Sequence, residues 1–479
     1  SAIASSDPLY VIDGVIVETG AVSDRSNGVG FMDDGGGNLL STINPNDIQS
    51  IEILKDAAAT AIYGARGSSG VVLITTKSGS SGETKVDITI DTGISEVTRK
   101  VDFVNAEEYL MLAQEAWYNS GENPTLFWQN SGVLVDGLTK AEALSTDTDW
   151  QDQALRQGVS YRANVSASGG DEKTKFFISG NFLDEESIFV GNDYNKISAR
   201  TNLDHKLSDK LTIGTKLFFT YVNSSPVPVQ NGLGKSNSNL PIHPVYKSDG
   251  TYFNPTRNVK ASLDNWEYNS KRRTFLANWY LNYKLLDGLS FRSEYGINSV
   301  NNNDSQYMGS IIDGNGEAKA FQSAGSRNSW NLKNLLNYKN TFGKHRFDIL
   351  AGVEASKNTY QVSNIRGIGF SNSTLKTPQD AATQENYYNE SAYTFLSILG
   401  RVNYDFDGKY LLSVTARRDG SSRFGKNRQW GLFPAVSLGY NISEEPFFEN
   451  IKKTVNYLKL RASYGVSGNA EIGNYAYVS

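Results

Sequence analysis

Paired acidic side chains are the residues of this sequence that most resemble catalytic groups. Glu107 and Glu108 could supply the acid and the base of a glycoside hydrolase, a mechanism that needs two carboxyl groups at a defined separation. Adjacency in the sequence sets no such separation, and neighbouring acids usually lie on a solvated surface. Asp33 and Asp34 precede three glycines, but the segment lacks the alternating ligands and the distal glutamate of a calcium loop. These acids therefore predict neither hydrolysis nor calcium binding.

Composition excludes several other kinds of site. The chain of 479 residues has no cysteine, which rules out disulfides, thiolate zinc sites and cysteine nucleophiles. The histidines at 205, 243 and 345 are never at ligand spacing, so a histidine metal site is not expected. A net charge of −5 favours neither a nucleic-acid surface nor a polybasic membrane contact. The sequence predicts no metal, no cofactor and no nucleic-acid partner.

A glycine-rich segment at 64–70, Gly-Ala-Arg-Gly-Ser-Ser-Gly, superficially resembles a phosphate-binding loop. It lacks the Gly-Lys-Ser/Thr ending and leads into an apolar strand instead of a helix. We therefore interpret the glycines as turn residues. We predict that Arg66 pairs with an acid on a neighbouring wall of the protein, and a buried pair of this kind would hold the segment in place.

Aromatic side chains in two long polar segments are the predicted contacts for a ligand. Sugar rings stack on aromatic faces through their C–H surfaces, and peptides also use aromatic pockets. The alternative is packing within the loops themselves: residues 104–117 have helical spacing, so Trp117 could close that helix onto a loop core. The candidates are Trp117, Trp128 and Trp150 in segment 96–158, and Tyr246, Trp266 and Tyr268 in segment 223–272.

Residues 1–80 contain the elements that would position Arg66. Apolar strands are expected at 8–12, 50–54 and 70–76, and Asp56 can cap a short helix over 57–63 that ends at Gly64. Strand, helix and strand in so short a stretch predict a small α/β unit. Its expected core consists of Ile51, Ile53, Leu54, Ile62, Val72 and Ile74.

From Val86 onward, apolar residues recur at every second position. Val86, Ile88 and Ile90 begin the pattern, and about 13 such segments can be counted, most of them about ten residues or longer. A tilted strand needs this length to cross a bilayer. The sequence has no run of about 18 apolar residues for a membrane helix. Residues 81–479 are therefore predicted to form a transmembrane antiparallel β-barrel.

The predicted connections alternate between short and long. Outer-membrane barrels combine tight periplasmic turns with long extracellular loops in this way. A soluble extracellular β protein that binds glycans is the alternative, but its strands are usually shorter and it has no reason to place every long loop at one end. Aromatic residues near the predicted strand ends, such as Tyr404, Phe406 and Tyr410, match the girdles at membrane interfaces. The short connections are 169–174, 208–210, 286–289, 342–345 and 405–409, and the long ones are 96–158, 223–272, 300–327 and 357–392.

Several long motifs resemble the SusC/RagA type of TonB-dependent outer-membrane transporter. They lie at 8–14 (Pro-Leu-Tyr-Val-Ile-Asp-Gly), 44–56, 59–67, 70–77, 417–425, 430–440 and 458–465. The resemblance implies that residues 1–80 are the C-terminal part of a plug domain and that 81–479 are the N-terminal part of the barrel. It implies a complete barrel of 22 strands, of which about 13 are present here. The signal peptide, the TonB-binding box and the first part of the plug would lie outside this sequence.

The resemblance also implies a function. It is the active import of oligosaccharide or peptide nutrients across the outer membrane of a Gram-negative bacterium of the Bacteroidetes group. The TonB complex of the inner membrane would supply the energy, a SusD-like surface lipoprotein would capture the cargo, and outer-membrane lipid would surround the barrel. A siderophore receptor is the alternative within this class, and an outer-membrane hydrolase is the alternative outside it. Loops decide the substrate, which the sequence does not identify.

Overall fold

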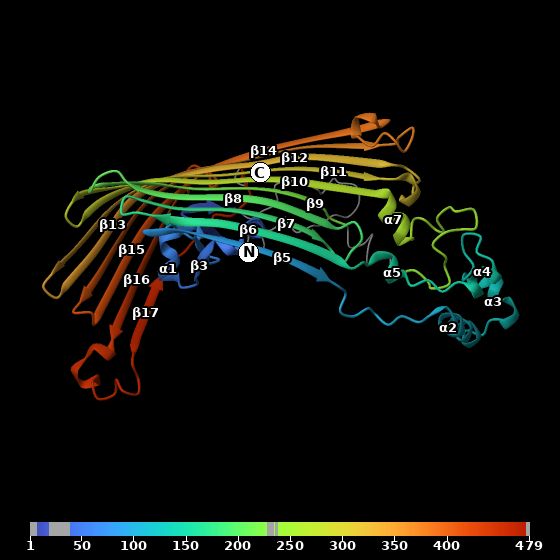
Figure 1. Ribbon diagram of the computed structural model, residues 1–479, viewed down its shortest axis with the longest axis horizontal. Coiled ribbons are helices and arrows are strands. Elements are labelled where there is room, and N and C mark those ends of the chain that lie inside the picture. The colour runs from blue at the N-terminus through green and yellow to red at the C-terminus, as the bar shows by residue number, and fades with distance from the viewer. Residues whose placement is uncertain (1–6, 19–38, 228–233, 235–237, 476–479) are drawn as a thin grey trace.

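Figure 1 shows a computed structural model that describes residues 7–18, 39–227, 234 and 238–475. The strands of this part form two sheets, one of four strands and one of 13. The large sheet curves into an arch, and the small sheet lies with its short helices in the concavity (Figure 1). Asp33 and Asp34, considered above for calcium, lie outside the described residues.

The small sheet confirms the three strands expected in residues 1–80. Its strand order is β2-β1-β4-β3, with β1 parallel to β4 and the other pairs antiparallel. The strands are β1 (Leu9–Ile12), β2 (Val15–Val17), β3 (Ile48–Leu54) and β4 (Val71–Thr76). The helical elements are α1 (Ala57–Thr60) and the 3-10 helices η1 (Leu39–Thr42), η2 (Pro45–Asp47) and η3 (Ala61–Arg66).

The helix predicted over 57–63 is only partly correct. The α-helix ends at Thr60, and the chain continues as a 3-10 helix to Arg66. Within that second helix Gly64 has φ of 54° and ψ of −122°. Side chains strongly disfavour this backbone conformation, whereas glycine adopts it readily. The glycine therefore redirects the chain just before Arg66.

The predicted core of the small unit is partly wrong. Ile74 is buried in an apolar cluster that joins the small sheet to the concave face of the large one. Ile51 and Ile53, in contrast, are 55% and 58% exposed. They lie on β3, the edge strand, beyond the area that this cluster covers. The other three residues, Leu54, Ile62 and Val72, are half-buried.

The large sheet is an antiparallel meander, in which each strand pairs with its neighbours in the sequence. The expected number of about 13 strands is confirmed. The strands are β5 (Gly82–Ser95), β6 (Gly158–Gly170), β7 (Thr174–Glu186), β8 (Asp193–Lys206), β9 (Leu211–Ser225), β10 (Trp266–Leu286), β11 (Leu289–Met308), β12 (Lys319–Phe342), β13 (His345–Ile368), β14 (Thr383–Phe406), β15 (Tyr410–Ser421), β16 (Trp430–Asn441) and β17 (Lys459–Gly465).

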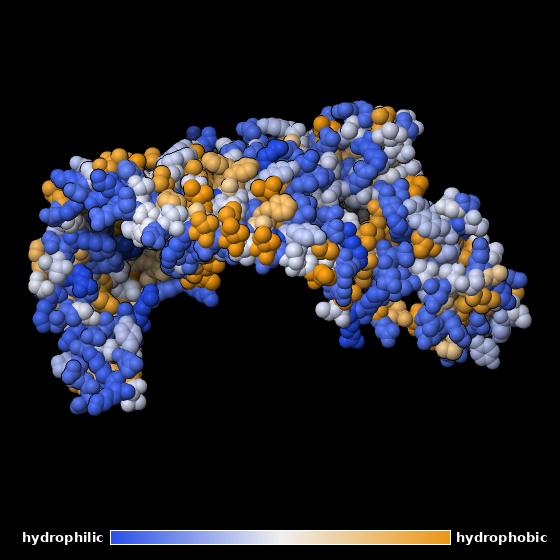
Figure 2. Space-filling view, viewed as in Figure 1, coloured by the Kyte–Doolittle hydropathy of each residue, from blue (hydrophilic) through white to orange (hydrophobic). Residues whose placement is uncertain are grey.

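The period of two places apolar side chains on the convex face. Val86, Ile88 and Ile90 of β5 are 60%, 69% and 75% exposed, an arrangement that suits lipid and not water. Figure 2 shows apolar side chains gathered over the middle of the visible sheet, whereas the loops are largely polar. Phe218 and Thr220 of β9 point to the concave face and are buried beneath the small sheet.

The shortest connections lie at one end of the sheet, the turn end, and most long ones at the other, the loop end (Figure 1). An exception is the connection 442–458, which is long although it lies at the turn end. Three predicted loops are shorter than expected, because their flanking strands reach up to 24 residues. Where both faces of the sheet meet water, apolar and polar residues no longer alternate, but the backbone hydrogen bonds between the strands continue. The connections are 226–265, 309–318 and 369–382 instead of 223–272, 300–327 and 357–392.

Residues 96–157 and 238–265, which belong to two connections at the loop end, pack together into what we call the loop module. Leu110, Phe127, Ile242 and Phe253 share its core. None of the helices in the described ranges is both long and apolar enough to cross a membrane. The module contains α2 (Ala106–Asn119), η4 (Pro124–Leu126), α3 (Phe127–Asn130), α4 (Lys140–Ser145), α5 (Trp150–Ala154) and α7 (Val259–Asn265). The other 3-10 helices are η5 (Ser310–Ile312), η6 (Pro378–Asp380), η7 (Ile442–Glu444) and η8 (Pro446–Phe448).

Aromatic rings line the turn end, as the sequence predicted. Tyr410 stacks on Tyr440 with ring centroids 5.1 Å apart, and Tyr404 lies 5.0 Å from Phe347. Phe406 lies 6.3 Å from the Tyr410 ring. A band of adjacent rings at one level of the sheet is typical of a membrane interface.

Candidate functional site

A cluster of four ionised side chains fastens the small unit to the concave wall. Arg66 donates to Glu354 of β13 at 2.8 Å, and Arg417 of β15 donates to the other oxygen of that carboxylate at 2.9 Å. Arg417 also pairs with Asp419 at 2.6 Å. We call Arg66, Glu354, Arg417 and Asp419 the ion cluster. Its cations and carboxylates alternate, so each carboxylate lies beside a guanidinium.

The backbone of η3 takes part in the ion cluster. The N–H of Ala65 donates to Asp419 Oδ2 at 2.6 Å, and the carbonyl of Ile62 accepts from Arg417 Nη1 at 2.6 Å. A Cβ at Gly64 would lie 2.0 Å from the Asp419 carboxylate, so only glycine permits this approach. The same glycine thus redirects the chain and makes room for the acid.

Burial gives the ion cluster its strength. The side chains of Arg66 and Glu354 are 8% and 5% exposed, so solvent screens their attraction weakly. Desolvated charges are costly unless they are paired, and removing one partner of such a pair typically costs about 3–5 kcal/mol. Burial, with a smaller contribution from the Glu354 carboxylate, raises the pKa of Tyr63 to about 12, so this phenol stays neutral.

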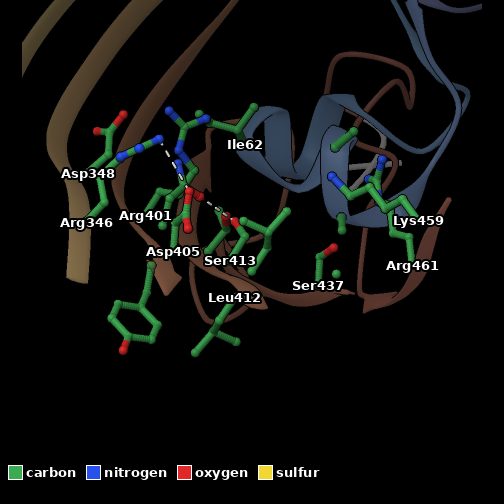
Figure 3. A pocket seen from close by; sticks show the side chains of 17 residues that line it. Ile62, Arg346, Asp348, Arg401, Asp405, Leu412, Ser413, Ser437, Lys459 and Arg461 are labelled. Atoms are coloured by element: carbon green, nitrogen blue, oxygen red, sulfur yellow. Dashed lines mark hydrogen bonds and ion pairs between the residues drawn. The ribbon is translucent and has the colours of Figure 1, made fainter. Parts of the chain in front are cut away.

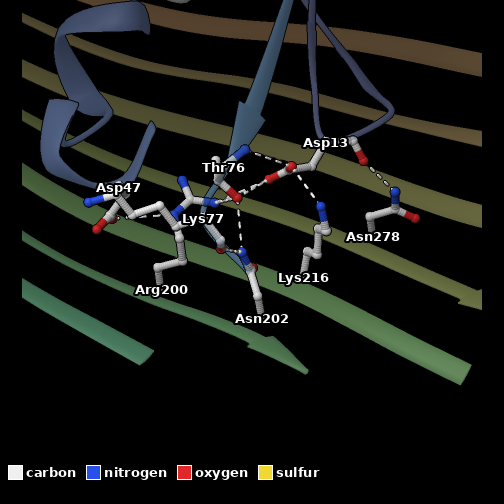
Figure 4. A network of polar contacts seen from close by, with 8 residues as sticks. All are labelled: Asp13, Asp47, Thr76, Lys77, Arg200, Asn202, Lys216 and Asn278. Atoms are coloured by element: carbon white, nitrogen blue, oxygen red, sulfur yellow. Dashed lines mark hydrogen bonds and ion pairs between the residues drawn. The ribbon is translucent and has the colours of Figure 1, made fainter. Parts of the chain in front are cut away.

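A second polar network lies on the other side of the small unit, against β8 and β9 (Figure 4). Asp13, in the turn between β1 and β2, accepts from Thr76 Oγ1 at 2.6 Å and from Lys216 Nζ at 2.9 Å. Arg200 lies between Asp13 and Asp47, at 3.4 Å and 3.3 Å from their carboxylates. Asn202, Asn278 and Lys333 add hydrogen bonds to the backbone of Lys77, Asp13 and Gly14.

A cavity of about 370 Å³ opens above the ion cluster, toward the loop end. We call it the upper cavity. Arg327 of β12 and Arg423 of the β15–β16 connection line it beside Arg66. Tyr393 and Phe395 of β14 supply two aromatic walls, and the Arg423 guanidinium lies 3.7 Å from the Tyr393 ring. Guanidinium groups bind carboxylates and phosphates, whereas aromatic faces bind sugars or apolar side chains. Glu18 and Glu471 also line the cavity.

The three predicted tryptophans of segment 96–158 lie within the loop module. Trp117 and Trp128 pack against its core, and Trp117 Nε1 donates to the carbonyl of Asn123 at 2.9 Å. Trp150 is buried, and its Nε1 donates to the carbonyl of Leu240 at 2.9 Å. These contacts are those of loop-core packing, and the structure does not bring the three rings together around a cavity.

The predicted aromatics of segment 223–272 are spread over two elements. Trp266 begins β10 and packs in a cluster with Phe321, and Tyr268, two residues further on, is buried. Tyr246 is 45% exposed, and its ring centroid lies 5.1 Å from that of Tyr252. Tyr246 is therefore the one of these three rings that presents a large free face.

Sequence reasoning missed the residues of the upper cavity. Arg423 falls in the motif 417–425, which carried a family resemblance but no assigned role. The sequence assigned Arg327 to a polar loop and placed Tyr393 at the margin of another, although both residues lie well inside long strands, β12 and β14. The alternation of apolar and polar residues could not identify them, because this pattern does not extend into those parts of the strands. Within the described ranges, no group of three or more histidine, cysteine or acidic residues has the arrangement of a metal site.

The geometry is that of part of a β-barrel wall that curves around a plug, and the comparisons with known proteins assign the chain to a family. Residues 3–71 match the TonB-dependent receptor plug domain, and residues 220–478 match the TonB-dependent receptor-like β-barrel. The second match covers more than half of the chain. The chain therefore belongs to the TonB-dependent receptors, which are outer-membrane transporters and not enzymes.

Within this family the chain is SusC/RagA-like. It is 32% identical to a TonB-dependent receptor of Formosa agariphila, over 98% of this chain and 43% of that protein. It is 28% identical to the TonB-dependent receptor SusC of Bacteroides thetaiotaomicron, over 99% of this chain and 47% of SusC. The RagAB peptide transporter has the same fold, with a TM-score of 0.81 at 23% identity over 98% of this chain and 55% of that one. The chain spans about half the length of the curated relatives it matches.

Proposed function

We propose that this protein actively imports oligosaccharide or peptide nutrients through the outer membrane, with energy delivered by the TonB complex. One observation carries the proposal: a small folded unit fills the concavity of the wall and is held there by buried ion pairs, directly below a cavity of mixed charge and aromatic character. Such a unit blocks free diffusion, and work is needed to break buried pairs. Import therefore requires an external source of energy.

The partner and the cargo follow from the relatives and from the upper cavity. We propose a SusD-like surface lipoprotein that delivers cargo at the loop end, by analogy with SusC and with the RagAB peptide transporter. Arg327, Arg423 and the rings of Tyr393 and Phe395 would hold the cargo. Among the loop aromatics we retain Tyr246 as a contact with incoming cargo, because its ring is exposed.

The test compares cells that carry the gene with cells that lack it. Each strain receives two mixtures: a tryptic digest of casein, and oligosaccharides that contain both neutral sugars and uronates. Mass spectrometry of the medium identifies the components that are removed. We expect removal of one mixture to require the gene, TonB and a SusD-like lipoprotein encoded beside it. Uptake that is equal in all strains would contradict the proposal, and a defect restricted to ferric chelates would favour a siderophore receptor instead.

A further inference from the structure

A second cavity adjoins the plug on the side of the turn end. It has a volume of about 480 Å³ and lies between α1 and strands β13–β17. Figure 3 shows Arg346, Arg401, Lys459 and Arg461 around it, with Asp348 and Asp405 as the labelled acids. We call it the lower cavity. In the outer membrane the turn end faces the periplasm, so this cavity lies on the exit side of the plug.

The upper and the lower cavity share one strand of the wall. On the concave face of β14, Phe395 lines the upper cavity and Arg401 lines the lower one. The two residues are six positions apart, which corresponds to roughly 20 Å along a strand. Ser397 lies between them, and its hydroxyl accepts a hydrogen bond from Arg417 Nη2 at 2.9 Å.

The ion cluster separates the two cavities. Ser397 pairs in register with Glu354 on one side and with Asp419 on the other, so the two acids and the serine form a row across β13, β14 and β15. Arg417 lies two residues from Asp419 along β15, toward the lower cavity, and pairs in register with Leu399. A cargo that follows β14 from one cavity to the other therefore passes the ion cluster and no other layer of charged residues on that strand.

The charges of the lower cavity favour an anionic group. Arg346 is already paired with Asp405 at 3.3 Å, and Arg461 with Asp56 at 2.7 Å. Arg401 differs, because its Nε is buried and has no hydrogen-bond partner among the described residues. A carboxylate that entered the cavity would accept from the Arg401 guanidinium, and a turn of this side chain toward it would also satisfy the buried Nε–H.

The opposite side of the plug is held by apolar packing against the wall. Ile12, Val15, Val17 and Ile74 pack there on Phe218, Leu276 and Val300 of β9, β10 and β11. The network around Asp13 and Arg200 adds buried ion pairs on the same side (Figure 4). The plug is thus held along β8–β11 by apolar packing and ion pairs, whereas its contacts along β13–β17, which include the ion cluster, lie between the upper and the lower cavity.

We infer that cargo leaves the plug along the concave face of β14, past the ion cluster, and that the lower cavity is an exit site where Arg401 receives a carboxylate or another anionic group of the cargo. The inference rests on the proposed function. The plug stays attached to β6–β11 and moves away from β14–β17. The cargo class is set by the guanidinium groups on both sides of the ion cluster: Arg327 and Arg423 above it, and Arg401 below it.

Two cysteine pairs test the side on which the plug opens, and these 479 residues contain no natural cysteine that would compete with them. Asp56→Cys with Ser463→Cys joins the plug to β17, where the two side chains are hydrogen-bonded at 2.8 Å. Asn44→Cys with Asn164→Cys joins it to β6, where the side chains are hydrogen-bonded at 3.1 Å. Each disulfide is formed by oxidation in cells, verified by mass spectrometry and reversed with dithiothreitol. Single-cysteine variants serve as controls.

The readout is import of whichever of the two nutrient mixtures the unmodified transporter removes. We expect the disulfide to β17 to abolish import until it is reduced, and the disulfide to β6 to leave at least half of it. Equal block by both disulfides, block by neither, or block by the β6 disulfide alone would overturn the inference. Import by the variants after reduction of their disulfides tests the proposed function separately. If the reduced variants did not import either mixture, the proposed function would fail, independently of the route.

A substitution at the exit site gives an independent test. Arg401→Gln should slow the removal of acidic components of the mixture by about tenfold and leave neutral components unchanged. Arg292→Gln is the matched control, because Arg292 lies on the concave face near the turn end of β11, away from the lower cavity. A variant that merely disturbed the wall would slow acidic and neutral components alike. An unchanged ratio of acidic to neutral uptake in Arg401→Gln would refute the exit site.

Discussion

Removal of the Arg66 side chain is the sharpest test of the plug fastening. Glu354 accepts from two guanidinium groups, so in Arg66→Ala it keeps Arg417 as a partner. The variant therefore loses one buried charge-assisted hydrogen bond without leaving a bare carboxylate. Such a bond contributes about 1.5–3 kcal/mol, which is less than the cost of an unpaired buried charge. Glu354→Ala removes the shared acceptor and should cost more.

Hydrogen exchange measures this energy locally. Amides of residues 57–70 exchange through opening of the plug segment, and a loss of 1.5–3 kcal/mol accelerates that exchange by about 10- to 150-fold. The wall should be unaffected, because its strands pair with each other. Mass spectrometry of the protein in detergent micelles separates the two regions.

The matched control is another ion pair between plug and wall. Arg461 and Asp56 are 53% and 35% exposed, so their 2.7 Å contact is screened by water. Exposed pairs contribute at most about 1 kcal/mol, and Arg461→Ala should accelerate exchange less than about fivefold. Equal effects of Arg66→Ala and Arg461→Ala, or unchanged exchange in Arg66→Ala, would refute the view that the buried pair holds the plug.

Three further predictions concern the wall, the loop module and the orientation. Val414→Arg places a charge on the lipid-facing side and should cost about 2–4 kcal/mol near the midplane, seen as lost insertion into liposomes, whereas Ser413→Arg faces the lower cavity and should insert normally. Burial lowers the pKa of His243 to about 4. Because the unfolded loop binds this proton more readily, the contribution of His243 to the stability of the loop module is complete above pH 6.5 and is lost as the pH falls to 4, by roughly 3 kcal/mol at most. His243→Gln should abolish this pH dependence of loop exchange, and an unchanged profile would contradict the assignment. Cysteine at Asn386 should react with an impermeant maleimide on whole cells, whereas cysteine at Asp209 should not, and the reverse pattern would invert the orientation.

Much of the fold could be predicted because the bilayer imposes a repeating rule on the sequence. Val86, Ile88 and Ile90 alternate with polar residues since one face of β5 meets lipid. The rule ends at the membrane surface. Asn301 and Asn303 of β11 lie in a strand although neither face needs apolar residues there, so the sequence assigned this region to a loop. Backbone hydrogen bonds extend the strands beyond the membrane surface, and they do not depend on a pattern of side chains that a sequence would reveal.

The candidate site was less predictable than the fold, because its contacts join distant parts of the chain. Arg66 was identified by its glycine-rich surroundings, but nothing local indicated Glu354 as its partner. The loop tryptophans were conspicuous as residue types, and Trp150 in fact hydrogen-bonds within the loop module. Burial depends on the assembled fold, and a single sequence does not reveal which rings are covered.

The sequence distances within the ion cluster impose an order on the assembly of the protein. Glu354 lies 288 residues after Arg66, and Asp419 lies 354 residues after Ala65. The wall can grow one hairpin at a time from neighbouring segments, since each strand pairs with the next. The ion pairs of the plug join partners that lie far apart in the sequence, such as Asp13 with Lys216 and Arg66 with Glu354. The contacts of Asp13 and Asp47 with Arg200 and Lys216 can therefore form once β8 and β9 are in place, whereas the ion cluster can be completed only after β15 has been added.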